Sequence, residues 1–305
     1  MKSRSFKHVQ RGLTLVELMI ALVISMVIVI AAASFFLSSS RSRDTQEAAS
    51  ALQDNARFAT EIITRNIQQA GYQNYIWGSV GATVRREVAP PSDDEPDIRG
   101  YNNTAAASDL DHGVHDRTTN RVNNSDTLVV RYQGSGATTG DGSMIDCLGR
   151  PQPEGDRAYS IFAVGQSTGS TEPELRCKYY SVNPSGNTFV VEPIVRGVEM
   201  LQFMYGVDTG TDTFVDKWLN AAEVSPTAST TPMADWAKVK SVRVGMILRS
   251  PNRVTVAAGT TTTMAPLGSN FSQSNSSFPD TLVVNNSDGR LRRVVTFTVN
   301  LRNPL

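Results

Sequence analysis

The chain has 305 residues with 29 basic and 29 acidic side chains, and this zero net charge argues against a general nucleic-acid-binding protein, which needs a basic surplus. Hydrophobic residues make up 40% of it, as in globular rather than disordered proteins. Two cysteines exclude a cysteine-rich zinc scaffold and allow at most one internal disulfide.

The N-terminal segment differs sharply from the rest of the chain. Residues 1–12 hold four basic side chains and no acidic one, and residues 13–37 are almost entirely apolar. The stretch 18–37 contains no charge, and a helix of that length extends about 30 Å, enough to cross the hydrocarbon core of a bilayer. The basic flank predicts that the N-terminus stays cytoplasmic and that the remainder is exported.

One carboxylate, that of Glu17, lies near the start of this apolar run. A charged side chain costs roughly 2.5–3.5 kcal/mol at the bilayer centre and less near an interface, so such a residue indicates a function. A secretory signal peptide fits poorly, because its apolar core is usually about 7–15 residues and ends at a small-residue cleavage site. A plain single-pass anchor stays open from the residues alone, but it gives no reason for Glu17.

A helix is predicted to continue beyond the apolar run, because neither Gly nor Pro interrupts the chain before Gly71. Apolar residues recur there at three- and four-residue steps, and they are Leu52, Ala56, Ala59, Ile63, Ile67 and Ala70. We predict one helix over 13–71, apolar on all sides over 13–37 and amphipathic over 38–71, with Gly71 as its C-terminal cap.

Residues 72–305 predict a β-rich head. Seven runs rich in Val, Tyr, Phe and Thr are typical of strands, and they are 126–133, 159–165, 175–182, 187–193, 198–207, 239–250 and 291–303. Their short connections favour an antiparallel sheet over repeated βαβ units. Residues 79–125 and 251–280 are rich in Ser, Thr and Asn, and we expect long loops there. The predicted fold class is α+β, with the long helix packed on an antiparallel sheet.

The sequence RGLTLVELMIALVI, which begins at Arg11, resembles the class III signal of type IV pilins and secretion pseudopilins. The resemblance implies that a prepilin peptidase cuts after Gly12, removes the leader 1–12 and N-methylates the new first residue, Leu13. It also implies that Glu17, at position five of the mature chain, is the assembly glutamate. The family's usual first residue is Phe, and Leu13 departs from it mildly because it is also bulky and apolar.

Cleavage would create a positive amine on Leu13, close in sequence to the carboxylate of Glu17. In a packed filament, Glu17 of one subunit can face the amine of its neighbour. Opposite charges about 4 Å apart gain about 4 kcal/mol at an effective dielectric near 20, before desolvation is subtracted. Such a pair would favour assembly and set the axial register, as a buried polar residue does in a coiled coil.

Three stretches of the head resemble PilW-type minor pilins and the related J-type pseudopilins of type II secretion: GVEMLQFMYGVD (197–208), WAKVKSVRVGMILRS (236–250) and RRVVTFTVNLRN (292–303). The resemblance implies a pilin-like fold and a single-pass inner-membrane protein with a periplasmic head, which is incorporated into a type IV pilus at its tip. Its role would be to join a complex that primes pilus assembly.

The same resemblance implies a set of partners and no nucleic acid. The partners are the prepilin peptidase, other minor pilins and the major pilin, the inner-membrane assembly platform, a tip adhesin and the lipid bilayer. Two alternatives stay open. One is a J-type pseudopilin of a type II secretion system. The other is a membrane-anchored adhesive or binding module, with the loops at 79–125 and 251–280 as contact surfaces.

Cys147 and Cys177 lie in the part of the chain that is expected to be exported. An oxidising periplasm favours a disulfide between them, and two unpaired thiols are the alternative. A redox function is not indicated, because there is no Cys-x-x-Cys pair. No Gly-x-Ser-x-Gly, P-loop or paired-carboxylate motif appears either, so we do not expect an enzyme.

Asp208, Asp212 and Asp216 lie where PilW-type proteins often resemble a calcium loop. Here Gly210 interrupts the pattern of acids, and Leu219 stands at the twelfth position, where a Glu is expected. Calcium prefers six to eight oxygen ligands. We therefore favour an acidic turn over a calcium site and expect no cofactor.

Overall fold

The computed structural model describes residues 14–73, 96–104, 122–137, 139–155, 157–181, 188–210, 212, 214–226, 229–254, 261–271 and 280–303. The chain divides into two units, Met1–Glu47 and Ala48–Leu305. The predicted cleavage site, Gly12 and Leu13, lies outside the described residues, as do most of the residues of the predicted loop 79–125.

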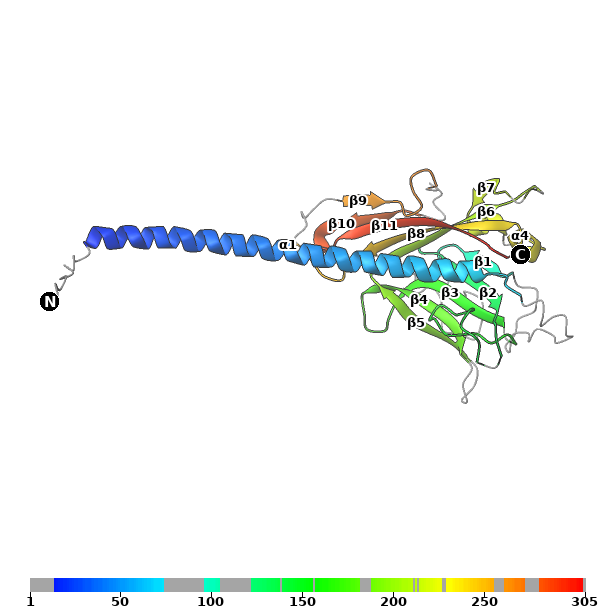
Figure 1. Ribbon diagram of the computed structural model, residues 1–305. Coiled ribbons are helices and arrows are strands. Elements are labelled where there is room, and N and C mark those ends of the chain that lie inside the picture. The colour runs from blue at the N-terminus through cyan, green and yellow to red at the C-terminus, as the bar shows by residue number, and fades with distance from the viewer. Residues whose placement is uncertain are drawn as a thin grey trace, which may run out of the picture. The chain divides into compact units, whose positions relative to one another are not determined.

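Helix α1 (Leu15–Gln69) occupies most of the range predicted to be helical (Figure 1). Its last residue is Gln69, two short of the predicted bound, and Gly71 follows with a φ of 69°, the left-handed conformation that favours glycine at a helix cap. Two long-range hydrogen bonds satisfy this end of the helix. The Gly71 N–H donates to the carbonyl of Arg131 at 3.0 Å, and Asn303 Nδ2 donates to the carbonyl of Ala70 at 2.9 Å.

Five strands form an antiparallel sheet in chain order: β1 (Ile98–Tyr101), β2 (Thr127–Gln133), β3 (Arg157–Gln166), β4 (Pro173–Ser181) and β5 (Thr188–Arg196). A second antiparallel sheet has the order β11-β8-β6-β7, with β6 (Val198–Val207), β7 (Lys217–Leu219), β8 (Val239–Arg249) and β11 (Arg292–Asn300). Two short strands pair separately, β9 (Thr261–Met264) and β10 (Leu282–Asn285). The short helices are α3 (Ala221–Val224), α4 (Pro232–Trp236) and the 3-10 turn η1 (Asn286–Asp288).

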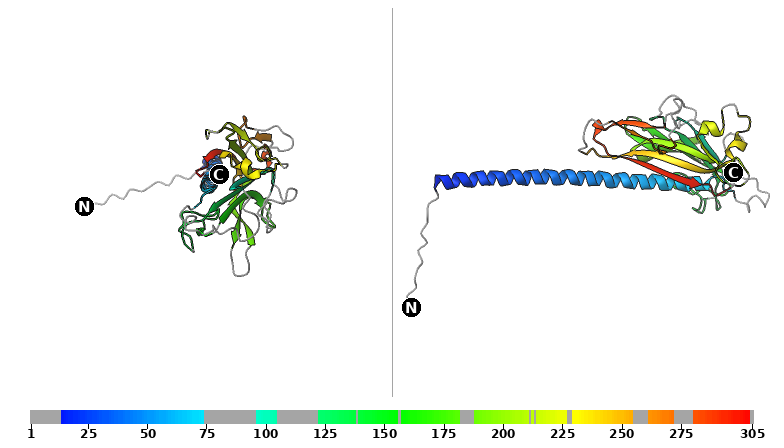
Figure 2. Two further views of the ribbon diagram at one scale, coloured as in Figure 1. Left: turned by 90° about the vertical axis from the view of Figure 1, so that its right-hand side faces the viewer. Right: turned by 90° about the horizontal axis from the view of Figure 1, so that it is seen from above.

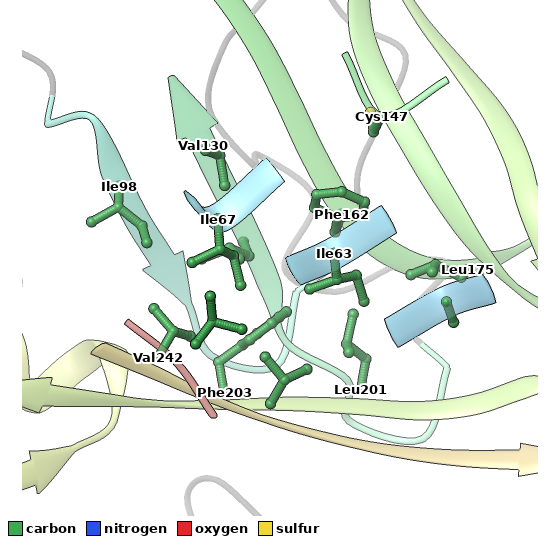
Figure 3. Close-up of a cluster of buried hydrophobic side chains, with 14 of the residues drawn as sticks. Ile63, Ile67, Ile98, Val130, Cys147, Phe162, Leu175, Leu201, Phe203 and Val242 are labelled. Carbon is green, nitrogen blue, oxygen red and sulfur yellow. The ribbon is translucent and has the colours of Figure 1, made fainter. Parts of the chain in front are cut away.

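The core of the second unit lies between its part of α1 and the two larger sheets. Figure 3 shows Ile63 and Ile67 of α1 among side chains of both sheets: Val130, Phe162 and Leu175 from one, and Leu201, Phe203 and Val242 from the other. Figures 1 and 2 show the two sheets on opposite sides of this part of the helix. Ile63 and Ile67 are fully buried, and each such side chain contributes about 1.5–3 kcal/mol.

The strand predictions located seven of the eleven strands in the described part of the chain, and the structure adds β1, β7, β9 and β10. Two of these lie inside ranges that were expected to be loops, β1 within 79–125 and β9 within 251–280. The four added strands have only three or four residues each, which is too short for a recognisable alternation of apolar residues. The α+β class is confirmed, but the head has two large sheets instead of one.

A disulfide joins Cys147, in the connection between β2 and β3, to Cys177 in β4. The two Cα atoms are 6.0 Å apart, and both side chains are fully buried. The bond therefore ties the β2–β3 connection to the middle of the five-stranded sheet.

A network of charged side chains links the two sheets near the β5–β6 turn, and it consists of Glu172, Glu199, Arg249, Asp288, Arg290 and Arg292. Arg249, at the end of β8, reaches Glu172 before β4 at 2.6 Å. Arg292 donates to both oxygens of Glu199, at 2.7 and 2.9 Å. Burial alone would lower the pKa of Arg292, but hydrogen bonds to Asp288 and Glu199 raise it. Removing one partner would leave a largely buried charge unpaired.

Asp126 joins the sheets at another place. It is 5% exposed, and its carboxylate accepts hydrogen bonds from the N–H groups of Asn103, which follows β1, at 2.9 Å and of Phe203 in β6 at 3.0 Å. Burial raises the pKa of Asp126 to about 7 in spite of these bonds, and the nearby Asp280 carboxyl raises it further. The sequence analysis did not identify this residue.

We predict that the Cys147–Cys177 bond stabilises the head. Replacing both cysteines with serine should lower the free energy of unfolding by roughly 3–4 kcal/mol, because the bond closes a loop of about 30 residues in the unfolded chain. The measurement is urea unfolding of the detergent-solubilised chain. Non-reducing peptide mapping of periplasmic material should recover the linked pair, and free thiols there would contradict the assignment.

We also predict that Asp126 makes the stability depend on pH. The folded carboxyl holds its proton up to about pH 7, whereas the unfolded one loses it near pH 3.8. Asp126 therefore stabilises the fold most in acid, and this contribution, up to roughly 4 kcal/mol, is lost as the pH rises from about 4 to 7.

The test compares urea midpoints from pH 4 to 8 for the wild type and for Asp126→Asn, whose side chain does not titrate. The difference between the two should shrink or change sign over this range. Asp54→Asn, at an exposed position of α1, is the matched control and should track the wild type. A constant offset between wild type and Asp126→Asn at every pH would contradict the prediction.

Candidate assembly site

The start of α1 is closed by a capping box. Thr14 stands immediately before the helix, and its N–H donates to Glu17 Oε2 at 2.9 Å. The Thr14 hydroxyl also donates to that oxygen at 3.1 Å, and the Glu17 N–H donates back to Thr14 Oγ1 at 3.3 Å. These bonds satisfy N–H groups that a helix leaves unpaired at its N-terminus. The Glu17 carboxylate therefore lies at the first turn, where the helix dipole favours negative charge.

The capping box uses only one of the two carboxylate oxygens. Within the described part of the chain, Glu17 Oε1 has no hydrogen-bond partner, whereas Oε2 is held by Thr14. The cap fixes where the carboxylate lies and leaves one oxygen able to accept a further hydrogen bond. The Thr-x-x-Glu spacing at a helix start is the signature of a capping box, and the sequence analysis did not use it.

The apolar residues that follow Glu17 are exposed on all sides of the helix in the isolated chain. Leu22, Val29, Phe35 and Phe36 are each more than 60% exposed. The two serines within the run, Ser25 and Ser34, donate to helix carbonyls at 2.8 and 2.9 Å, so their hydroxyls are satisfied within α1. Glu17 is therefore the one side chain from 15 to 37 whose hydrogen-bonding capacity is not met inside the helix.

Among the described residues, α1 is the one helix that is long and apolar enough to cross a membrane. Its most apolar 18-residue window has a mean hydropathy of 2.8, and none of that window is buried. Apolar surface of this extent needs lipid or other protein around it.

The acidic turn after β6 brings three carboxylates around Gly210. A methyl group added there would lie 3.7 Å from Asp208 Oδ1, 3.8 Å from Asp212 Oδ1 and 3.9 Å from Asp216 Oδ2. Each of these oxygens already accepts backbone hydrogen bonds within the turn, and two bonds from Thr209 lower the pKa of Asp216. Across the described residues, no group of three His, Cys, Asp or Glu side chains has an arrangement suited to a metal.

Two family models match the chain, one near its N-terminus and one over its C-terminal part. Residues 7–33 match the model of the prokaryotic N-terminal methylation motif, which covers Gly12, Leu13 and Glu17. Residues 161–303 match the model of the type IV pilus-assembly protein W family, PilW. The matched residues begin within β3 and end just after β11.

Other comparisons add less. No curated protein matches the sequence. A solved structure, the type IV-like pilin TTHA1219 from Thermus thermophilus, is 15% identical with a TM-score of 0.39, over 83% of this chain and 97% of that one. A likeness at that level adds nothing to the assignment. The two family matches confirm the resemblance seen in the sequence, and they lie on a long apolar N-terminal helix followed by antiparallel sheets. The chain therefore belongs to the PilW-type minor pilins of type IV pili.

Proposed function

We propose that this chain is a low-copy minor pilin that joins the complex priming type IV pilus assembly and stays at or near the tip. In this proposal a prepilin peptidase removes residues 1–12 and methylates Leu13. The chain is then held by its apolar segment in the inner membrane, with the head in the periplasm, until it enters the filament. The methylation motif over 7–33 and the exposed apolar run of α1 support this order of events.

The observation that carries the proposal is the capping box at Thr14 and Glu17. It holds the carboxylate at the first turn of α1 and leaves Oε1 without a partner. We assign that oxygen to the N-terminal amine of a neighbouring subunit. The charge pair would be well shielded from water among packed apolar helices, so its Coulombic attraction would be strong while its loss would leave a costly unpaired charge.

The proposed partners follow from the same geometry. The apolar run would contact lipid first and the helices of other minor pilins and the major pilin later, with the assembly platform mediating the transfer. The proposal assigns no reaction to the chain, because its contribution is packing and charge pairing. A J-type pseudopilin would use the same helix, and a strain that lacks the gene separates the two roles. Loss of twitching motility would indicate a minor pilin, and loss of enzyme secretion would indicate a pseudopilin.

Replacing Gly12 with a bulky residue should block processing. We expect Gly12→Leu to leave a precursor that migrates as a larger species by the length of the leader, because the peptidase needs a small residue before the cut. Ser5→Leu, elsewhere in the leader, is the matched control and should be cleaved normally. Mass spectrometry of the native protein gives the decisive readout, and a Gly12→Leu product that starts at Leu13 would contradict the cleavage assignment.

Removing the carboxylate should stop assembly and leave processing intact. We expect Glu17→Ala to be cleaved normally but to reduce surface piliation at least about tenfold, which corresponds to about 1.4 kcal/mol of lost pairing. Glu61→Ala removes an exposed glutamate from the same helix and should leave piliation unchanged. Counting pili by electron microscopy in complemented deletion strains tests this, and a normal count with Glu17→Ala would refute the charge pair.

A further inference from the structure

Strand β1 is an edge of the five-stranded sheet, and its hydrogen bonds show which backbone groups face outward. The Arg131 N–H of β2 donates to the carbonyl of Asp97 at 2.7 Å, just before β1 begins. In an antiparallel pair, bonded and non-bonded residues alternate. Arg99 and Tyr101 therefore bond to β2, and Gly100 turns its N–H and C=O away from the sheet. Within the described part of the chain, no hydrogen bond reaches these two groups of Gly100.

A groove of about 260 Å³ lies beside this edge, and Gly100, which lines it, is largely buried. Arg99, Gly100 and Asn102 form one wall of the groove. Ala222 of α3, Ser225 just after α3 and Trp236 of α4 line the other. The groove therefore offers a strand edge on one side and short helices on the other.

Buried polar atoms near the groove lack partners. Trp236 is 1% exposed, and among the residues that the structure describes neither its Nε1–H nor Asn102 Nδ2 has an acceptor. The hydroxyl of Tyr205 lies directly beneath Gly100, and it too has no hydrogen-bond partner among those residues. Buried donors without acceptors are uncommon and costly, so unmet groups beside one groove point to an occupant that carries acceptors.

The two edges of the sheet differ in how they are protected. β5, at the far edge, carries Pro193, and its pairing with β4 is interrupted by an irregularity at Leu175 and Arg176. Proline and bulges are devices that prevent an edge strand from pairing with other chains. β1 has neither of these features.

We propose that β1 is a docking edge for an extended segment of another pilin subunit, which adds to the sheet as a strand beyond β1 and lies in this groove. The segment's backbone would complete the hydrogen bonds of Gly100, and its carbonyls would give acceptors to the donors that line the groove. A peptide fits better than a sugar, because a paired N–H and C=O at strand spacing is what another strand complements. This inference rests on the proposed function in one respect, which is that the partner is another pilin.

The test places a photo-crosslinking amino acid at Ala222, an exposed residue of the groove, in the full chain within its native membranes and with its minor pilins present. The same residue at Ala234, exposed on α4 but outside the groove, is the control. Mass spectrometry of the adducts identifies the crosslinked residues. We expect adducts from position 222 to fall within one continuous segment of another pilin, and adducts from position 234 not to reach that segment.

A second variant fills the groove. Ala222→Trp should lower recovery of the co-purified minor-pilin complex at least tenfold, whereas Ala234→Trp should not, and an unchanged urea midpoint shows that each variant is folded. Adducts only within the same chain, adducts on non-protein material, or full recovery with Ala222→Trp would each overturn the docking edge. Processing and dependence on Glu17 are scored in the same strains. If those persist while the groove results fail, only this inference is lost.

Discussion

The apolar stripe on the second half of α1 is shared by two sheets, and the head depends on this sharing. Ile63 and Ile67 contact strands of both sheets, so neither sheet has a complete core without the helix. Burial of this stripe removes apolar surface of the helix and of both sheets from water, which favours folding. The polar links between the sheets, at Asp126 and in the arginine–glutamate network around Glu199, then fix how the sheets are oriented around the helix.

The two halves of α1 differ in where their apolar side chains lie. In the second unit the apolar stripe of α1 is buried, although Phe58, off the stripe, is 50% exposed, whereas from Leu15 to Leu37 apolar residues surround the helix and are exposed. A helix that is apolar all round is stable only among lipid or other helices, so this segment commits the chain to a membrane or a filament. Thr14 holds one oxygen of the Glu17 carboxylate, and the proposed amine of a neighbouring subunit would supply a bond to the other.

The helix and the strands that carry a local sequence pattern could be predicted, whereas the strands that are defined by pairing with other strands were missed. The helix, its cap at Gly71 and the seven longer strands carry strong periodicity or conformational signals. β1 and β9 are short and are defined by their neighbours, and the division into two sheets follows from the pairing of β11 with β8, which no local window encodes. At the candidate site, Glu17 stood out by its charge, whereas its cap by Thr14 required reading the spacing as well.

The hydrogen bond from Asn303 to the carbonyl of Ala70 joins residues 233 positions apart. Val299, in the last strand, also belongs to the core around Ile63. As the chain is synthesised from its N-terminal end, the helical stripe appears first, and the strand that completes its cover appears last. Contacts of such high sequence separation form slowly, and the half-finished head exposes apolar surface in the meantime. The core around the stripe therefore stays open until nearly the whole chain has been made.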